Sequence, residues 1–334
     1  MPSTRSFGWR QLLFPLVPAY RLAVALRNQR LERGWEPVQR LRWPVVSIGN
    51  LSTGGAGKTP LAIALAKALA KRGIQVDVLS RGYGRQSRLP ARVRTDGTSE
   101  EFGDEPMLIA LDADVPVYVA SRRYQAGLLA EAGQAESGGP RVHLLDDGFQ
   151  HRQLHRDIDI LLLDSRDWSD SLLPAGNLRE PLEAARRATV IAISADEPQL
   201  ERELLRWRWK GPIWRIERSM EVPEVDGPAI AFCGIARPEQ FFRGLEVAGM
   251  HIAERFVFPD HHRFSAANLK SLAEAGQKAG AVALVTTEKD RIRLQEIASA
   301  LPDSLPLKTA RLSTQICREE EAIDWLEARL RSTQ

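Results

Sequence analysis

The chain has 334 residues, of which 43% are hydrophobic and 27% are charged. This length is too great for a peptide hormone or a disulfide-stapled mini-domain, and it suits one large or two modest domains. The composition is close to that of ordinary globular proteins and excludes general disorder. The two cysteines, Cys233 and Cys317, are far apart in the sequence. They form neither a metal-binding spacing nor a disulfide framework, which is typical of a reducing compartment.

The net charge of +3 conceals a basic N-terminal end. Residues 1–43 contain eight arginines and only two acidic residues, so the rest of the chain is slightly acidic. This distribution indicates a local basic surface rather than a chain that is basic throughout. We therefore expect no nucleic-acid partner.

Residues 12–26 form the most apolar stretch within the basic end. Prolines and an arginine interrupt it, so it is too short for a transmembrane helix, and it lacks the features of a secretory signal. The prolines should kink any helix here. Apolar residues still recur at helical spacing among the arginines, namely Trp9, Leu13, Val17, Tyr20 and Val24. Two interpretations remain open: an amphipathic segment in the headgroup layer of a membrane, or an N-terminal helix packed on its own domain.

From Trp43 onward, short β-rich runs alternate with helical patterns. Continuous apolar runs such as Ile160–Leu163 indicate strands that are buried on both faces. We expect strands at residues 45–48, 76–79, 115–120, 142–145, 158–163 and 190–193, and a helix at residues 61–70. Alternating strands and helices of this kind predict a doubly wound, mostly parallel α/β sheet.

A proline-rich, acidic stretch at residues 221–228 breaks this pattern and indicates a domain boundary. A second α/β series follows, with strands at 229–232 and 282–286 and helices at 238–248 and near 318–330. We therefore predict three parts: a basic amphipathic segment at residues 1–35, a core domain at residues 36–222, and a smaller C-terminal α/β domain at residues 223–334. The closing helix is free to pack back on the core domain.

The sequence Ser52-Thr-Gly-Gly-Ala-Gly-Lys-Thr59 lies between the first expected strand and the helix that follows it. It matches the phosphate-binding loop (P-loop) pattern G-x-x-x-x-G-K-S/T except at Ser52, which replaces the first glycine. Its glycines let backbone N–H groups point at phosphates, Lys58 can reach the β- and γ-phosphates, and the Thr59 hydroxyl can hold Mg²⁺. A nucleotide site is therefore predicted at Ser52, Thr53, Gly54, Gly55, Ala56, Gly57, Lys58 and Thr59, in a P-loop NTPase-like fold.

Asp146 and Asp147 follow an expected strand. Because the carboxyl ends of parallel strands face one crevice, one of these carboxylates can order Mg²⁺ or its water shell. An acid pair that only caps a turn is the alternative. Other polar residues also have two interpretations. The acids of Gly103-Asp-Glu-Pro106 fit a helix N-cap. Arg122 and Arg123 could bind a phosphate or face water, and residues 173–181 could be a solvated loop. His261 and His262 could be structural or act in acid–base chemistry.

Together these motifs resemble the tetraacyldisaccharide 4′-kinase family, the lipid A 4′-kinases of Gram-negative bacteria. The resemblance extends from the basic start to Thr286-Thr-Glu-Lys-Asp290 and also includes Ser80-Arg-Gly-Tyr-Gly84, Gly103–Pro106, Asp146–His151 and Asp260-His261-His262. It implies ATP- and Mg²⁺-dependent phosphorylation of the 4′-hydroxyl of tetraacyldisaccharide 1-phosphate, which yields lipid IVA in lipopolysaccharide biosynthesis. It also implies peripheral contact at the cytoplasmic face of the inner membrane. We expect the chain to be a monomer.

The resemblance further implies residue roles. Asp104 and His261 would form a dyad that activates the sugar hydroxyl, with His262 the alternative to His261. Asp146, Asp147 and Glu180 would surround Mg²⁺ with Thr59, and Arg123 and Arg179 would be electrostatic partners of the phosphates. Because Asp104 and His261 fall in different predicted domains, we expect the dyad to form only when the domains approach.

Two other functions fit the P-loop. One is an ATPase or GTPase switch that delivers a partner or cofactor and hydrolyses nucleotide without a lipid acceptor. The other is a soluble small-molecule kinase, which would not need residues 1–35.

Overall fold

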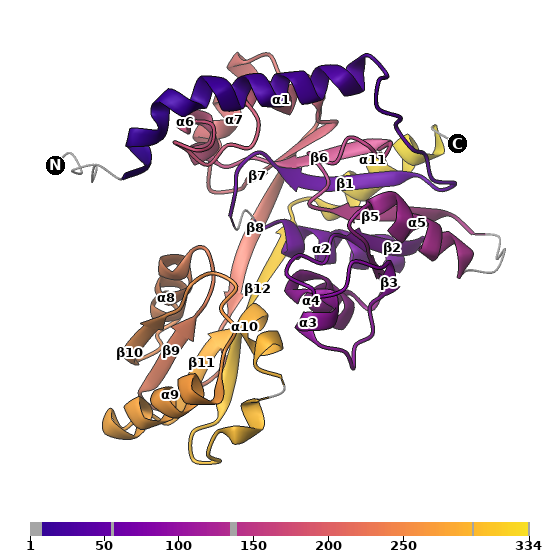
Figure 1. The fold of residues 1–334 in the computed structure, drawn as a ribbon. Helices are drawn as coiled ribbons and strands as arrows, with labels where there is room; N and C mark the ends of the chain where they lie inside the picture. Colours follow the sequence, from indigo (N-terminus) through magenta and orange to yellow (C-terminus); the bar gives the residue numbers. More distant parts are fainter. Residues whose placement is uncertain (1–8, 55–56, 134–138, 296, 333–334) are drawn as a thin grey trace. The chain divides into compact units, whose positions relative to one another are not determined.

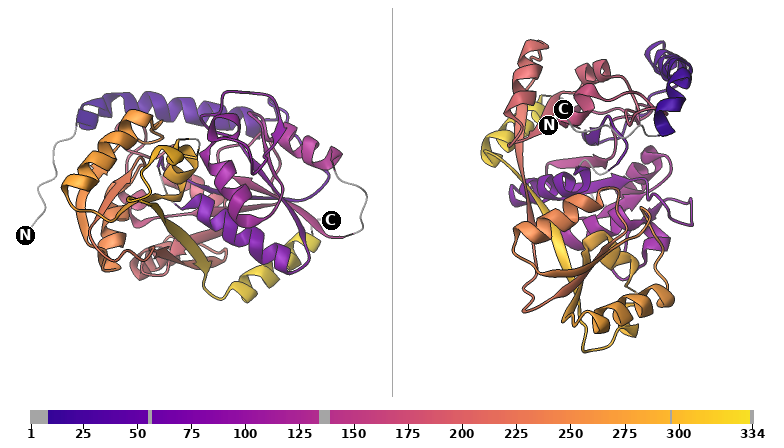
Figure 2. Two further views of the ribbon diagram at one scale, coloured as in Figure 1. Left: turned by 90° about the horizontal axis from the view of Figure 1, so that it is seen from below. Right: turned by 90° about the vertical axis from the view of Figure 1, so that its left-hand side faces the viewer.

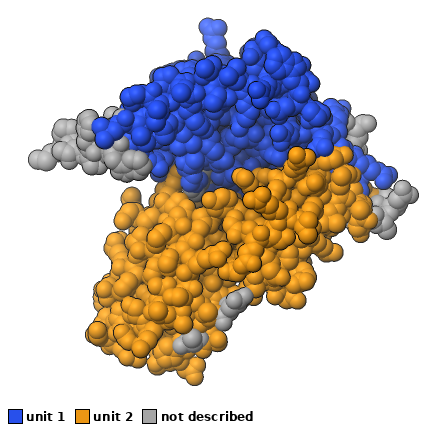
Figure 3. All heavy atoms as spheres, in the orientation of Figure 1, with its two compact units in different colours: residues 1–58, 141–217, 316–334 blue, residues 59–140, 218–315 orange. Residues whose placement is uncertain are grey.

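The computed structural model describes residues 9–54, 57–133, 139–295 and 297–332. The chain divides into two compact units that interleave along the sequence (Figure 3). Unit 1 comprises residues 1–58, 141–217 and 316–334, and unit 2 comprises residues 59–140 and 218–315. Each unit is therefore assembled from segments that are distant in the chain. The domain boundaries expected after residues 35 and 222 stay a prediction.

Unit 1 is built on a parallel sheet with the strand order β5–β1–β6–β7–β8 (Figure 1). Its strands are β1 (Val45–Asn50), β5 (Arg141–Asp146), β6 (Ile158–Leu162), β7 (Val190–Ser194) and the start of β8 (Ile213–Glu221). Its helices are η1 (Trp9–Leu16), α1 (Val17–Glu32), α6 (Ser165–Ser169), η2 (Leu182–Arg187), α7 (Pro198–Arg206) and α11 (Glu319–Arg331). β1 and β5 are buried along their whole length, as the continuous apolar runs predict.

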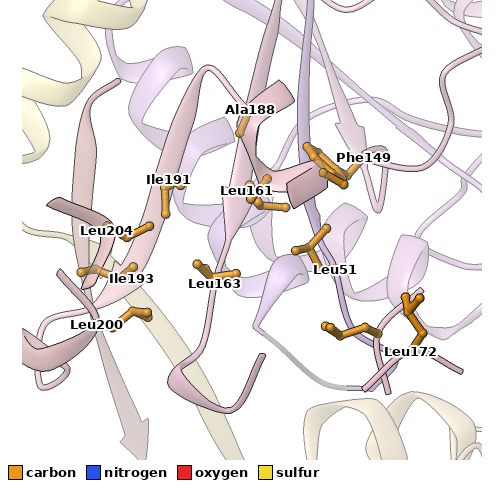
Figure 4. Packing of buried hydrophobic residues seen from close by; sticks show 13 residues of the cluster. Leu51, Phe149, Leu161, Leu163, Leu172, Ala188, Ile191, Ile193, Leu200 and Leu204 are labelled. Atoms are coloured by element: carbon orange, nitrogen blue, oxygen red, sulfur yellow. The ribbon is translucent and has the colours of Figure 1, made fainter. Parts of the chain in front are cut away.

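A buried apolar cluster stabilises one face of this sheet (Figure 4). Leu161 of β6 and Ile191 and Ile193 of β7 reach the same face, because side chains two residues apart on a strand point the same way. Leu200 and Leu204 of α7 pack against them. The cluster excludes water from the sheet beside the P-loop.

The N-terminal helix changes its geometry at the prolines. The first segment, η1, is a 3₁₀ helix that contains Pro15, and the α-helix α1 begins at Val17 with Pro18 in its first turn. Proline lacks the N–H that an α-helix interior needs but is tolerated in the first turn, so the predicted break is confirmed. Figures 1 and 2 show α1 along the outside of unit 1. No helix of the described residues has both the length and the apolar character to cross a membrane.

Unit 2 contains two strand groups. In one, β2 (Gln75–Ser80) pairs in parallel with β4 (Val117–Val119), and β3 (Ala91–Arg92) pairs antiparallel with β4. In the other, β9 (Ala229–Cys233), β10 (Ile252–Val257), β11 (Ala283–Thr287) and β12 (Leu307–Ile316) pair in parallel in the order β10–β9–β11–β12. The helices are α2 (Lys58–Lys71), which begins at the end of unit 1, and α3 (Ser99–Phe102), α4 (Asp104–Ala113), α5 (Arg123–Ala132), α8 (Pro238–Val247), α9 (Ala266–Lys278), α10 (Glu288–Arg293) and η3 (Ala298–Ala300).

The predicted α/β fold with a mostly parallel sheet is confirmed. Every strand expected from the apolar runs is present, with shifts of one or two residues at the ends. β4 is shorter than expected because Pro116, which has no N–H to donate, stands before its first residue. Strands β3, β8, β10 and β12 were not predicted, because their side chains are mostly exposed or half-buried and form no continuous apolar run.

Candidate active site

The P-loop follows β1 and continues into the start of α2, as its sequence pattern requires, and its residues 52–58 belong to unit 1. Ser52, at the position of the usual first glycine, is buried, and its Oγ accepts a hydrogen bond of 3.2 Å from Asn50 Nδ2. Gly54 and Gly57 have φ values of 99° and 82°, a region that L side chains rarely adopt. The Thr53 N–H donates to Asn177 O at 2.8 Å. Gly55 and Ala56, also predicted to bind nucleotide, lie outside the described residues.

Two cationic side chains, those of Lys58 and Arg179, contact two side-chain oxygen acceptors at the carboxyl ends of β1 and β5. Asn50 Oδ1 accepts hydrogen bonds from Lys58 Nζ at 2.9 Å and from Arg179 Nη2 at 2.8 Å. Asp147 accepts two bonds from Arg179, each of 3.2 Å, and its Oδ1 lies 3.5 Å from Lys58 Nζ. Lys58 and Arg179 thus concentrate positive charge beside the P-loop, which favours a polyphosphate anion. Asn50 had no predicted role, although it stands only two residues before the loop.

The acid pair Asp146-Asp147 stands at the end of β5, where parallel pairing places Asp146 opposite Ile48 of β1. Asp146 is buried, and Asp147 adopts a left-handed φ of 48° that turns the chain out of the strand. Carboxylate oxygens fit Mg²⁺, which needs only one or two of them besides phosphate and water. Within the described ranges no group of three or more His, Cys, Asp or Glu could hold a metal ion by itself. The residues present therefore fit Mg²⁺ that arrives with a nucleotide.

Glu180 is fully buried and is held by arginines. Arg27 Nη2, from α1, donates to its Oε1 at 3.0 Å, and Arg187 Nη2 donates to its Oε2 at 2.6 Å. Metal binding by Glu180, which the resemblance implies, would require one arginine to release its oxygen. In the structure Glu180 instead connects α1 with the segment that carries Arg179.

Asp104 and His261 are in contact in unit 2. His261 Nδ1 lies 2.9 Å from Asp104 Oδ2. Asp104 begins α4, after Gly103, while His261 follows β10 with a left-handed φ of 58°. Such a backbone conformation is uncommon for a non-glycine residue, although histidine tolerates it better than most side chains do. His262 instead places Nε2 3.1 Å from Asn268 Oδ1, so the geometry favours His261 as the partner of Asp104.

We expected this pair to form only when two domains approach, and that expectation stays a prediction. Both residues belong to unit 2, because the chain segments of the units interleave. The side chains are already hydrogen-bonded.

The protonation of the pair follows from its surroundings. Burial alone would raise the pKa of Asp104, but the hydrogen bond with His261 and the charge of Arg293 outweigh it and lower the pKa. The hydrogen bond to Asp104 raises the pKa of His261, against the opposing effect of burial. Asp104 therefore remains ionised at neutral pH and can only accept hydrogen bonds. Neutral His261 then carries its hydrogen on Nδ1, which leaves the lone pair on Nε2.

Arg293, at the end of α10, is a further member of this site that the sequence analysis did not identify. Its Nε donates to Asp104 Oδ2 at 2.7 Å, and its side chain is only 5% exposed. It stands three residues after Asp290, the last residue of the Thr-Thr-Glu-Lys-Asp motif. Asp104, His261 and Arg293 line one cavity of unit 2 together with Tyr83, Arg263 and Phe264.

Two predicted residues lie apart from these contacts. Thr59 is the second residue of α2 and is buried. Arg123 begins α5 and is also buried, and its Nη1 donates weakly to Ser121 O at 3.4 Å. Neither position contradicts the predicted roles, which stay predictions.

The chain matches known proteins along nearly its whole length. A family model described as tetraacyldisaccharide-1-P 4′-kinase matches residues 9–331. The chain belongs to the tetraacyldisaccharide 4′-kinase family. A tetraacyldisaccharide 4′-kinase from Koribacter versatilis is 42% identical over 320 residues, which cover 93% of this chain and 96% of that protein. A second, from Anaeromyxobacter dehalogenans, is 40% identical over 332 residues, which cover 91% of this chain and 86% of that protein.

A solved structure gives the same result. The "apo" form of LpxK from Aquifex aeolicus, crystallised in complex with ATP, is 33% identical and superposes with a TM-score of 0.75, covering 97% of this chain and all of that one. Family membership makes this chain a kinase with a P-loop fold and confirms the predicted family. Nothing in the comparisons favours the ATPase or GTPase switch.

Proposed function

We propose that the chain transfers the γ-phosphoryl group of Mg-ATP to the 4′-hydroxyl of tetraacyldisaccharide 1-phosphate and so produces lipid IVA for lipid A synthesis. The observation that carries this proposal beyond nucleotide binding is the hydrogen-bonded pair of Asp104 and His261. A sugar hydroxyl is a poor nucleophile, and a kinase that uses one benefits from an aligned base. Nε2 of His261, on the more exposed of the two side chains, is the atom that would accept the proton.

The nucleotide would bind at the P-loop, with its phosphates near Lys58 and Arg179. When bound, Mg²⁺ would neutralise phosphate charge, held by the Thr59 hydroxyl and by Asp146 or Asp147. Phosphoryl transfer depends mainly on positioning and charge neutralisation, which these cations supply. Lys58 and Arg179 would exchange their contacts with Asp147 and Asn50 for contacts with phosphate oxygens.

We also propose that α1 and η1 hold the enzyme at the cytoplasmic face of the inner membrane as a monomer. One side of α1 packs on unit 1 through Val17 and Tyr20, which join the buried cluster. Other large apolar side chains remain exposed, namely Leu12, Phe14, Leu16, Leu22 and Leu26. Arginines along the same segment suit anionic headgroups. Arg123 would serve as an electrostatic partner of the reacting phosphates or of the 1-phosphate of the lipid.

The decisive experiment measures ADP release by the purified chain with Mg-ATP, with and without tetraacyldisaccharide 1-phosphate. We expect ADP release to require the lipid and to stop when EDTA removes Mg²⁺. A matched lipid without the disaccharide controls for a general effect of detergent or surface. Equal ADP release with and without the acceptor would contradict the proposal and support an NTPase instead.

A further inference from the structure

Arg293 contacts both halves of the Asp104–His261 pair. Its guanidinium donates to Asp104 Oδ2 from Nε, and its Nη2 lies 2.7 Å from the same oxygen. The Nη2 atom is also 3.4 Å from His261 Nδ1. Because Asp104 Oδ2 receives donors from both Arg293 and His261, it is held in one orientation.

Asp290 in turn fixes Arg293. Asp290 is fully buried, and its Oδ1 accepts a hydrogen bond of 2.8 Å from Arg293 Nη1. Its Oδ2 accepts from the Thr287 hydroxyl at 2.7 Å and from the Gly234 N–H at 3.1 Å. A buried charge with donors at both oxygens has little freedom to move, so it holds the guanidinium in place.

Gly234 extends this network to the backbone of His261. Its carbonyl accepts from Arg293 Nη1 at 2.8 Å and from the His261 N–H at 3.1 Å. A Cβ at position 234 would meet Pro259 O at 3.1 Å and Asp290 Oδ1 at 3.3 Å, so the close approach suits glycine. One guanidinium thus connects the side chain of Asp104 with the loop that carries His261.

We propose that Arg293, anchored by Asp290, is a positioning residue that orients Asp104 toward His261 and sets the proton affinity of the pair. This inference rests on the proposed function, in which the pair activates the acceptor hydroxyl. Arg293 acts through Asp104 and His261 rather than on substrate. Asp290, within the Thr-Thr-Glu-Lys-Asp motif, thereby gains a role in the same step.

The sign of the effect follows from charge. The groups that face the pair are Arg293 and Asp290 of α10, Asp260 beside His261, and Tyr83, Glu100 and Arg263 at the shared cavity. Among them Arg293 lowers the pKa of both Asp104 and His261. Its removal should therefore make the pair hold a proton more tightly. In a plot of kcat against pH, the acidic limb, where kcat falls as the pH drops, should then move to higher pH.

The test compares Arg293→Gln with the matched variant Arg291→Gln, which changes an exposed arginine of the same helix. We expect Arg293→Gln to lower kcat by about 10- to 100-fold, part of the contribution of a general base, with the KM for ATP unchanged. The acidic limb should move upward, and Arg291→Gln should match the wild type. In an Asp104→Ala background the Arg293 substitution should add little further loss. The proposal would be overturned if Arg293→Gln kept the wild-type kcat, or if its kcat fell without a shift of the acidic limb. It would also be overturned if the losses of kcat from Arg293→Gln and Asp104→Ala were additive.

Two further measurements test this proposal even if Arg293→Gln does not fold or the proposed function is wrong. Arg293→Lys keeps the charge but not the fork of donors, so we expect a partial loss of kcat with the limb at its wild-type pH. Unchanged kcat in that variant would overturn the positioning role, even if Arg293→Gln does not fold. NMR titration of His261 in the full chain needs no lipid turnover. An upward pKa shift in Arg293→Gln supports the proposal and no shift overturns it, whether or not the chain phosphorylates the lipid.

Discussion

Two neighbours of His261 act on its proton affinity in opposite directions. Asp104 raises the pKa of His261 through a hydrogen bond, and Arg293 lowers it through its charge. Since the Asp104 bond is the larger influence, the net pKa of His261 lies above its ordinary value of 6.5. A base at Nε2 must be neutral to accept a proton, so activity should fall as the pH drops through this raised pKa.

The exchange Asp104→Asn tests this balance. Asparagine can still accept a hydrogen bond from Nδ1 but has no charge, so the pKa of His261 should fall. We expect kcat to decrease by about 10²- to 10⁴-fold, the usual contribution of a general base, and the acidic limb to move to lower pH. That direction is opposite to the one expected for Arg293→Gln. The check is kcat against pH, with ATP binding measured separately and expected to be unchanged.

His262→Gln is the matched control for this prediction, because His262 contacts Asn268 rather than Asp104. A loss in His262→Gln equal to that in His261→Gln would contradict the assignment. So would an Asp104→Asn enzyme with the wild-type rate and limb.

The sequence indicates which residues can take part in chemistry, but it does not indicate which of them are in contact. The family resemblance, rather than the local sequence around either residue, implied that Asp104 and His261 form a pair, although 157 positions separate them. Nothing in the local sequence distinguishes His261 from His262, because only the fold brings one of them to Asp104. Arg293 was missed for the same reason: a lone arginine outside the quoted motifs acquires its role from distant partners.

The N-terminal helix packs on its own unit, which is one of the two interpretations that the sequence left open, and its contact with a membrane stays a proposal. Val24 and Leu31 of α1 are buried, and Tyr20 donates to Arg179 O at 3.1 Å, so the helix packs on its own unit. Leu12 remains 75% exposed and Leu22 60% exposed. An exposed apolar face beside arginines is available for a lipid surface.

The combined variant Leu12→Ser, Phe14→Ser and Leu16→Ser should bind anionic vesicles more weakly. Full burial of one such side chain contributes roughly 1.5–3 kcal/mol, so each inserted residue should account for about tenfold or more in affinity. Co-sedimentation with vesicles checks this, and kcat on detergent-solubilised lipid should be unchanged. The control is Val247→Ser, which changes a valine that is 80% exposed on α8. Equal vesicle binding by all three proteins would refute the membrane role and support a soluble kinase.

Among the strands, burial decided which could be predicted. β1, β5 and β6 are buried on both faces and have continuous apolar runs, so the sequence indicated them clearly. β8 alternates buried and exposed positions and includes Arg215 and Glu217, and β12 is mostly half-buried. Their strand conformation depends on partners from elsewhere in the chain rather than on local composition.

For the molecule as a whole, composition predicts a linear division of the chain, whereas the contacts divide it into two interleaved units. Composition changes near residues 221–228, but β8 runs up to Glu221 at the start of that stretch and β9 begins just beyond it. Segments such as 59–140 and 218–315 belong to one compact unit because their side chains pack together, which a scan along the chain does not detect. The consequence for function is that Asp104 and His261 meet within a single unit.

Transfer of a phosphoryl group from nucleotide at the P-loop to an acylated sugar can be checked on the lipid product itself. Purified chain, Mg-ATP and tetraacyldisaccharide 1-phosphate would be incubated, and the lipid examined by mass spectrometry and ³¹P NMR. We expect one added phosphate, located at the 4′-oxygen, and almost none with Asp104→Ala. An unmodified lipid beside released inorganic phosphate, or a phosphate at another position, would contradict it.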